Sequence, residues 1–202
     1  MTDNERFRLF IAVAIPEEVQ VKMEAAQVEL RRVLPERLVR WTKREQFHLT
    51  LRFLGEVEVP RVEALGDFLR AACQGFSPRH LRAQGVGFFP DLRFPRVAWV
   101  GVSDQDNQLP RLHQAVEAAS QNFTAEAPDE RFTGHVTLAR IKGIRRPEAD
   151  ALGQAAAGMA ERLFGHWTAY KIELMRSELS PQGARHTPLA AIALAGVPAN
   201  LA

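Results

Sequence analysis

Hydrophobic residues recur along the chain in two kinds of pattern, one typical of strands and one typical of helices. Short runs rich in Ile, Val, Leu and Phe predict β-strands at residues 8–15, 47–53, 81–89, 96–102, 135–141, 167–179 and 189–195. Hydrophobic positions three or four apart predict helices that begin near Pro16 and Pro60, and further helices over 109–123 and 147–164. Strands and helices are interspersed throughout, which indicates an α+β protein.

Two copies of one motif give this pattern an internal symmetry. His48-Leu-Thr-Leu and His135-Val-Thr-Leu each begin a predicted strand, and a proline follows each histidine by twelve residues. The copies are 87 residues apart, close to the 88 residues between the strands that begin at Arg8 and Arg96. We interpret this as a repeat that covers most of the chain.

The repeat predicts an α+β, bilobal, pseudo-symmetric fold: two antiparallel-sheet lobes with helices outside and a central cleft. Residues 1–202 contain no convincing linker. We therefore expect a single compact domain of two repeat-related lobes, corresponding approximately to the sequence halves 1–90 and 91–202, and a monomer, since such a site needs no partner subunit.

The paired motifs suit acid–base chemistry on phosphate. Residues i and i+2 of a strand share a face, so His48 lies beside Thr50, and His135 beside Thr137. One neutral imidazole can accept a proton from an attacking oxygen while the other, protonated, donates one to a leaving oxygen. Threonine hydroxyls can donate to non-bridging phosphate oxygens.

Charge refines this picture. The 26 Lys and Arg nearly balance 24 Asp and Glu, which excludes a generic polycation that coats long nucleic acid. Arg52 and Arg140 follow the two histidines by four and five residues, and we expect both to bind phosphate. Basic stretches at 31–44 and 140–146 adjoin the motif strands; they are either solvated faces or guides for RNA.

Other chemistries find little support. A single cysteine, Cys73, excludes an internal disulfide framework, and no apolar run is long enough to span a bilayer. We expect a cytoplasmic protein without membrane attachment. No ligand set for zinc accompanies the motif histidines, and we expect no metal and no cofactor.

The remaining candidates are individual side chains. His186 precedes the last predicted strand and could reach the cleft, whereas we interpret His80, His113 and His166 as surface or structural residues. Trp41, or the pair Phe88-Phe89, could stack on a base, although core packing is the alternative for each.

The motifs His48-Leu-Thr-Leu-Arg-Phe-Leu-Gly and His135-Val-Thr-Leu-Ala-Arg resemble the two signatures of the two-histidine (2H) phosphoesterases. The chain is most similar to the RNA 2′,3′-cyclic phosphodiesterases, once described as 2′-5′ RNA ligases. The resemblance extends to Arg8–Pro16, Gly87–Pro90, Pro95–Gly101 and Leu174–Leu179.

This resemblance implies hydrolysis of an RNA terminal 2′,3′-cyclic phosphate to a 2′-phosphomonoester, with RNA ends or short oligonucleotides as partners. It implies His48 as proton donor to the leaving 3′ oxygen and His135 as proton acceptor from water, with Thr50, Thr137 and Arg140 holding the phosphate. From the motifs alone the two histidines are interchangeable.

Two departures from the family pattern stand near the site. Gly134 replaces the usual proline before the second histidine, which we expect to loosen the entry to that strand. Gly183-Ala-Arg-His186 replaces a Gly-Ser-x-Tyr segment, so a contact from that tyrosine to the base or ribose is not expected.

Two alternative functions remain at this point. The same site could join RNA ends by using a 5′-hydroxyl in place of water, which would form a 2′-5′ linkage. The chain could instead be a non-catalytic RNA-binding module that uses its basic stretches and aromatic residues.

Overall fold

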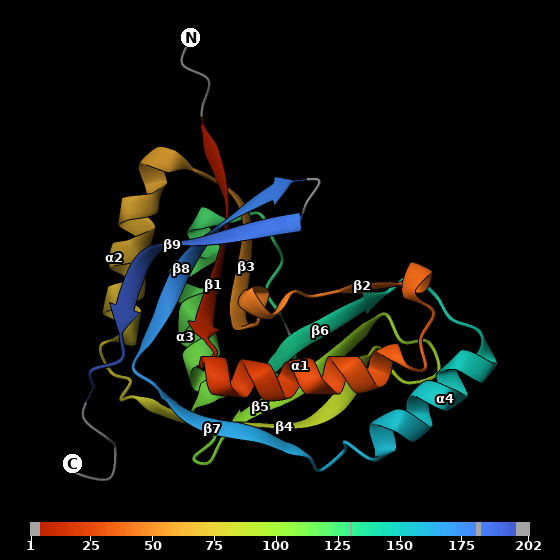
Figure 1. Cartoon of the computed structure of the whole chain (residues 1–202). Coiled ribbons are helices and arrows are strands. Elements are labelled where there is room, and N and C mark those ends of the chain that lie inside the picture. The colour runs from red at the N-terminus through yellow and green to blue at the C-terminus, as the bar shows by residue number, and fades with distance from the viewer. Residues whose placement is uncertain (1–4, 130, 181–182, 197–202) are drawn as a thin grey trace.

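The computed structural model describes residues 5–129, 131–180 and 183–196, which contain nine strands and four α-helices (Figure 1). The strands are β1 (Arg6–Ala14), β2 (Val39–Trp41), β3 (His48–Glu58), β4 (Arg79–Phe89), β5 (Val97–Asp104), β6 (His135–Ile141), β7 (Leu163–Ala169), β8 (Lys171–Ser180) and β9 (Gly183–Ala193). The helices are α1 (Glu17–Arg31), α2 (Val62–Cys73), α3 (Leu109–Ser120) and α4 (Arg146–Ala157). Short 3₁₀ turns are η1 (Glu36–Leu38), η2 (Arg44–Gln46), η3 (Val59–Arg61) and η4 (Gln121–Phe123).

All described strands join one antiparallel sheet in the order β7-β4-β5-β6-β3-β1-β8-β9, and β2 adds to β6. The two motif strands, β3 and β6, lie at the centre and share a single residue pair, Leu49 with Val136. The sheet is therefore narrow at its middle, and two groups of strands diverge from the point where the motifs begin (Figure 1). The predicted bilobal α+β arrangement is confirmed.

The lobes do not coincide with the sequence halves 1–90 and 91–202. β4 lies with β5, β6 and β7, whereas the C-terminal β8 and β9 return to β1. Helix α1 packs on β6 and β7, while α2 and α3 pack on each other and on β9 and β3. Each repeat thus contributes elements to both lobes.

Several predicted boundaries differ from the structure, and three of them have a clear physical reason. The single strand predicted over 167–179 is divided at Tyr170 into β7 and β8, because the chain changes partner there from β4 to β1. β9 begins at Gly183 rather than 189 and contains Pro188, which an edge strand tolerates because its outer side forms no ladder. The helix predicted over 147–164 ends at Ala157, just before Gly158.

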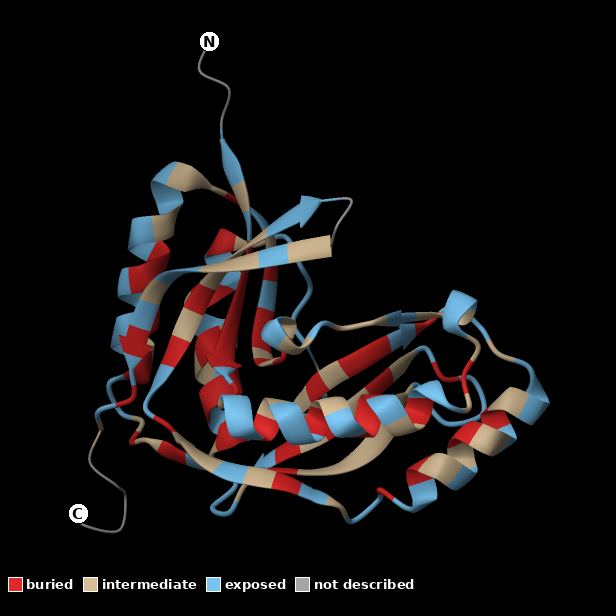
Figure 2. Cartoon of the chain, in the orientation of Figure 1, coloured by how far each residue is buried: buried red, intermediate tan, exposed pale blue. Residues whose placement is uncertain are grey.

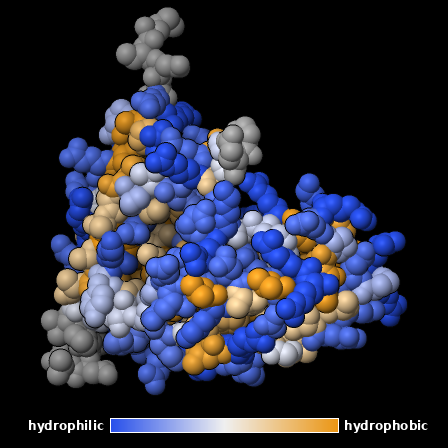
Figure 3. All heavy atoms as spheres, viewed as in Figure 1, coloured by the Kyte–Doolittle hydropathy of each residue, from blue (hydrophilic) through white to orange (hydrophobic). Residues whose placement is uncertain are grey.

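The hydrophobic faces of these elements form one continuous core. Leu49 and Leu51 of β3, and Val136 and Leu138 of β6, are buried behind the motif residues. Buried positions occur along both of these strands in Figure 2. Hydrophilic residues cover most of the face seen in Figure 3, and hydrophobic ones form only small patches there. Within the described ranges, no helix is both long and apolar enough to cross a membrane.

Candidate active site

A cleft of about 730 Å³ lies between the two groups of strands, and its walls contain both motifs. His48, Thr50, His135 and Thr137 all line it, as does Arg140. The remaining lining residues come from nearly every strand and include Arg8, Phe10, Arg40, Trp41, Gln46, Phe53, Phe89, Glu126 and His186. The pairing that the repeat predicts is thus present within one chain.

Each motif histidine is held in the same way by a backbone carbonyl two residues before it. His48 Nδ1 lies 2.7 Å from the carbonyl oxygen of Gln46, and His135 Nδ1 lies 2.7 Å from that of Thr133. A carbonyl can only accept, so Nδ1 carries the proton in both rings. Nε2 of each imidazole is then left to take or give a proton in the cleft.

The register at the centre of the sheet brings each histidine toward the threonine of the other motif. Because β3 and β6 are antiparallel and Leu49 pairs with Val136, His48 falls opposite Thr137, and Thr50 opposite His135. The two motif pairs are therefore related by an approximate two-fold axis through that residue pair. A phosphate near this axis can meet groups from both motifs.

Both motif strands carry a β-bulge at the same position of the repeat. Leu51 is the extra residue of β3, between Thr50 and Arg52, and Leu138 is the extra residue of β6, between Thr137 and Ala139. A bulge inverts the alternation of the faces beyond it. The side chains that next reach the cleft are consequently five residues after each histidine, not four.

This shift explains where the two predicted arginines lie. Arg140 is five residues after His135 and lines the cleft, whereas its counterpart five residues after His48 is Phe53. Arg52 does not line the cleft: the bulge turns it to the other face, where its buried side chain forms an ion pair with Glu117 of α3. The expectation that Arg52 binds phosphate is therefore not met.

Aromatic rings flank both imidazoles, but the surroundings of the two are not identical. The ring of His48 lies 4.7 Å from that of Phe10 and 5.4 Å from that of His186, which meets it edge-on. The ring of His135 lies 5.0 Å from that of Phe89. His186 therefore does reach the cleft, and its buried Nδ1 has no hydrogen-bond partner among the residues that the structure describes.

Burial dominates the titration of both motif histidines. It lowers the pKa of His48 to about 4, against a smaller opposing effect of the hydrogen bond to Gln46. Burial also lowers the pKa of His135; the bond to Thr133 and the charge of Asp129 oppose this, and the charge of Arg140 adds to it. Both imidazoles are neutral at pH 7 in the absence of an anion.

Three arginines give the cleft a positive rim. Arg8 extends from β1, and Arg40 and Arg140 are paired residues of β2 and β6. Like charges directly opposite each other on adjacent strands destabilise a sheet, and an anion bound between them removes that cost. The sequence reading missed Arg8 and Arg40, although Arg40 lay within the basic stretch 31–44.

Two other arginines of that stretch contact neighbouring side chains. Arg31 stacks over the ring of Trp41 at 4.8 Å, and Arg44 lies 3.9 Å from Glu17 and 3.8 Å from Glu24. Trp41 and Phe89 line the cleft, so both remain candidates for contact with a base.

The expected looseness at Gly134 is not observed: its backbone packs so closely on β5 that a Cβ would lie 2.4 Å from the Val102 carbonyl oxygen.

The other histidines lie outside the cleft. His80 Nδ1 is 2.9 Å from the hydroxyl of Thr168, and His113 is buried on α3. Among the described residues, no cluster of three or more His, Cys, Asp or Glu side chains could hold a metal ion.

Comparison with known proteins agrees with this geometry. The family model described as LigT like phosphoesterase matches twice, over residues 13–99 and 100–186, so that its two matches follow the internal repeat. An RNA 2′,3′-cyclic phosphodiesterase of Thermus thermophilus is 34% identical over 199 residues, covering 94% of this chain and 91% of the relative. Another of that name from Aeropyrum pernix is 37% identical over 139 residues, covering 69% and 77%.

Solved structures share the fold. The crystal structure of TT0787 of Thermus thermophilus has a TM-score of 0.72 at 32% identity, covering 94% of this chain and 98% of that one. The structure of E. coli LigT complexed with 3′-AMP has a TM-score of 0.73 at 22% identity, covering 94% and 99%. From the double match, the relatives and the fold together, the chain belongs to the LigT-like family of two-histidine phosphoesterases.

Proposed function

We propose that this protein hydrolyses the terminal 2′,3′-cyclic phosphate of RNA to a 2′-phosphomonoester, without a metal. The observation that carries the proposal is the pair of equivalent imidazoles in one cleft, each with Nδ1 bound to a carbonyl and Nε2 available. Relatives that cover most of this chain carry the name RNA 2′,3′-cyclic phosphodiesterase.

In the proposed reaction, His135 Nε2 accepts a proton from water as the water oxygen forms a bond to phosphorus. The bond from phosphorus to the 3′ oxygen breaks, and His48 Nε2 donates a proton to that oxygen. The products are a 2′-phosphate and a 3′-hydroxyl, and the two histidines exchange protonation states. Thr50 and Thr137 donate to the non-bridging oxygens, and Arg140 stabilises their charge.

The position of Arg140 supports His135 as the base, although His48, with a pKa of about 4, is also neutral in the free protein. Arg140 adjoins His135 and favours its neutral form, which is the form a base needs. Phe53 occupies the corresponding place beside His48 and contributes no charge. The anionic phosphate raises the pKa of His48 on binding, so the acid becomes protonated when substrate is present.

The positive rim supports RNA rather than a mononucleotide as substrate. We propose that the exposed side chains of Arg37 of η1 and Lys142 extend the basic surface of Arg40 and Arg140, because the backbone N–H of Lys142 donates to the carbonyl of Leu38 and brings these segments together. Phosphates of the strand that precedes the cyclic end would meet this surface. Both histidines belong to one chain, so we propose a monomer of one domain as the active unit.

The test is incubation of an oligonucleotide that ends in a 2′,3′-cyclic phosphate with the protein and a chelator. We expect a 2′-phosphate as product, and losses of at least ~10²-fold in kcat for His48→Ala and His135→Ala. The matched control is His166→Ala, an exposed histidine outside the cleft. Full activity in either motif variant would contradict the proposal, and adding a 5′-hydroxyl fragment separates hydrolysis from end joining.

A further inference from the structure

We propose that Arg52, Glu117 and His113 form a clamp behind the sheet that positions the imidazole of His135. None of the three lines the active-site cleft, so they would be positioning residues rather than catalytic ones. The inference rests on the proposed function for its kinetic tests, and on the geometry of the clamp for the others.

Arg52 joins the first motif strand, β3, to the segment between η4 and β6, which leads into the second motif strand. Its guanidinium forms an ion pair with Glu117 and donates to two backbone carbonyls, those of Glu126 at 2.9 Å and Ala127 at 3.2 Å. Only 4% of the Arg52 side chain is exposed. A buried guanidinium with several acceptors fixes those acceptors relative to β3, because its planar donors are rigid.

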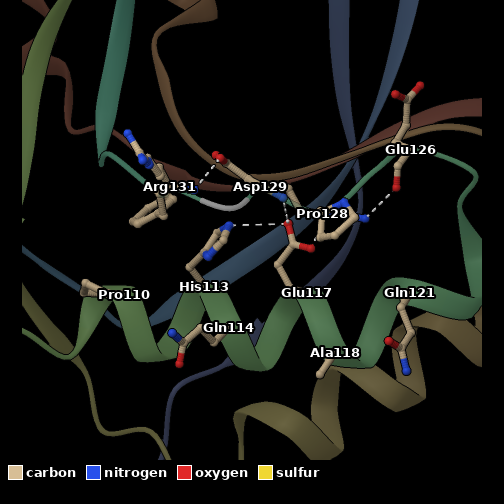
Figure 4. Close-up of a pocket in the computed structure, with 12 residues that line it drawn as sticks. Pro110, His113, Gln114, Glu117, Ala118, Gln121, Glu126, Pro128, Asp129 and Arg131 are labelled. Atoms are coloured by element: carbon tan, nitrogen blue, oxygen red, sulfur yellow. Dashed lines mark hydrogen bonds and ion pairs between the residues drawn. The ribbon is translucent and has the colours of Figure 1, made fainter.

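Glu117 and His113 extend the clamp toward the second histidine. Besides its ion pair with Arg52, the carboxylate of Glu117 accepts from the backbone N–H of Asp129 at 3.4 Å, and the same oxygen lies 3.4 Å from His113 Nε2 (Figure 4). The ring of His113 stacks on that of Phe132, with the centroids 4.2 Å apart and the planes at 19°. The clamp therefore touches this segment near its beginning, middle and end.

The last of these contacts lies one residue from the group that orients His135. Phe132 precedes Thr133, whose carbonyl accepts the Nδ1–H of His135. Displacement of Phe132 would move that carbonyl and release the ring. The first histidine has a separate anchor, since the side-chain amide of Gln46 donates to the carbonyl of Ala184 in β9 while the backbone carbonyl of Gln46 holds His48.

The outer side of the clamp borders a pocket of about 680 Å³, lined by α3 and by the same segment. His113, Glu117 and Asp129 face one another across one end of it (Figure 4). The contacts of the clamp hold this segment together with three further contacts: the bond from the Thr124 hydroxyl to the Leu54 carbonyl, the packing of Phe132 on the core, and the bond from the Val102 N–H to the Gly134 carbonyl.

Arg52→Lys is the first test, because lysine keeps the charge but cannot bind Glu117 and both carbonyls together. We expect kcat to fall about 10- to 100-fold, KM to change less than about twofold, and the pKa of His135 measured by NMR to fall as its Nδ1–H bond weakens. The matched control is Arg79→Lys, at another buried arginine that pairs with Asp106. It should leave kcat and the pKa of His135 unchanged.

A double variant, Arg52→Met with Glu117→Met, separates positioning from stability. Replacement of a buried ion pair by apolar side chains commonly preserves stability, but methionine cannot hold the segment. We expect a folded protein with low kcat. The proposal would be overturned if the double variant were as stable as the wild type and had the same kcat. It would also be overturned if Arg52→Lys left both kcat and the pKa of His135 unchanged. If the wild type hydrolyses no cyclic phosphate, the proposed function fails, while the NMR titration of His135 still decides the clamp.

Discussion

The buried imidazole of His48 makes the stability of the fold depend on pH in a way that can be calculated. Its pKa is about 4 in the folded chain and 6.5 as the ordinary value expected on unfolding. Between these values the unfolded chain binds more protons than the folded one, so stability falls as the pH falls from above 6.5 toward 4. At pH 5 the linkage relation gives a loss of about 2 kcal/mol from this group alone.

The assay is denaturant unfolding of the wild type and of His48→Asn at pH 7 and at pH 5. Other titrating groups, His135 and His186 among them, affect both proteins, and the difference between the two losses isolates His48. We expect the wild type to lose about 2 kcal/mol more than the variant, and an NMR titration of the ring to locate its pKa. Equal losses in the two proteins would refute the argument that burial controls this imidazole.

Three further predictions concern the cleft and its rim. Arg140→Ala should lower kcat/KM about 10²-fold. Arg140→Lys should restore only part of this loss, because lysine lacks the planar fork of the guanidinium. Full restoration by lysine would argue against a contact of the guanidinium with two phosphate oxygens. Gly134→Ala should destabilise the fold by about 1–3 kcal/mol in denaturant unfolding, whereas Gly75→Ala, where an added Cβ meets open space, should not; equal effects would contradict the close packing on β5. KM for oligonucleotides that end in a cyclic phosphate should rise with salt more steeply than KM for a cyclic mononucleotide. Arg37→Ala should raise KM for the oligonucleotides only. Equal salt dependence of the two KM values would leave the basic rim without a role in RNA binding.

The sequence was sufficient for the central features because they are local or repeated. The facing of His48 with Thr50 follows from the period of two in a strand, and the second motif 87 residues later indicates a paired site. The same regularity failed at Arg52, since a bulge inverts the faces after Leu51 and no local residue pattern marks it. It also failed at β8, where the chain changes its sheet partner.

What the sequence by itself determined is the pairing of the two motifs, their symmetry and the α+β class, because hydrophobic periodicity and an internal repeat can be recognised along the chain. Only the tertiary structure decided which of the two predicted arginines lines the cleft, how the two repeats exchange elements between lobes, and that Arg8, Arg40 and His186 join the cleft. The physical reason is that strand pairing and bulges depend on residues far apart in the chain. Contacts such as Arg52 with Glu117, 65 positions apart, form only when the sheet has closed.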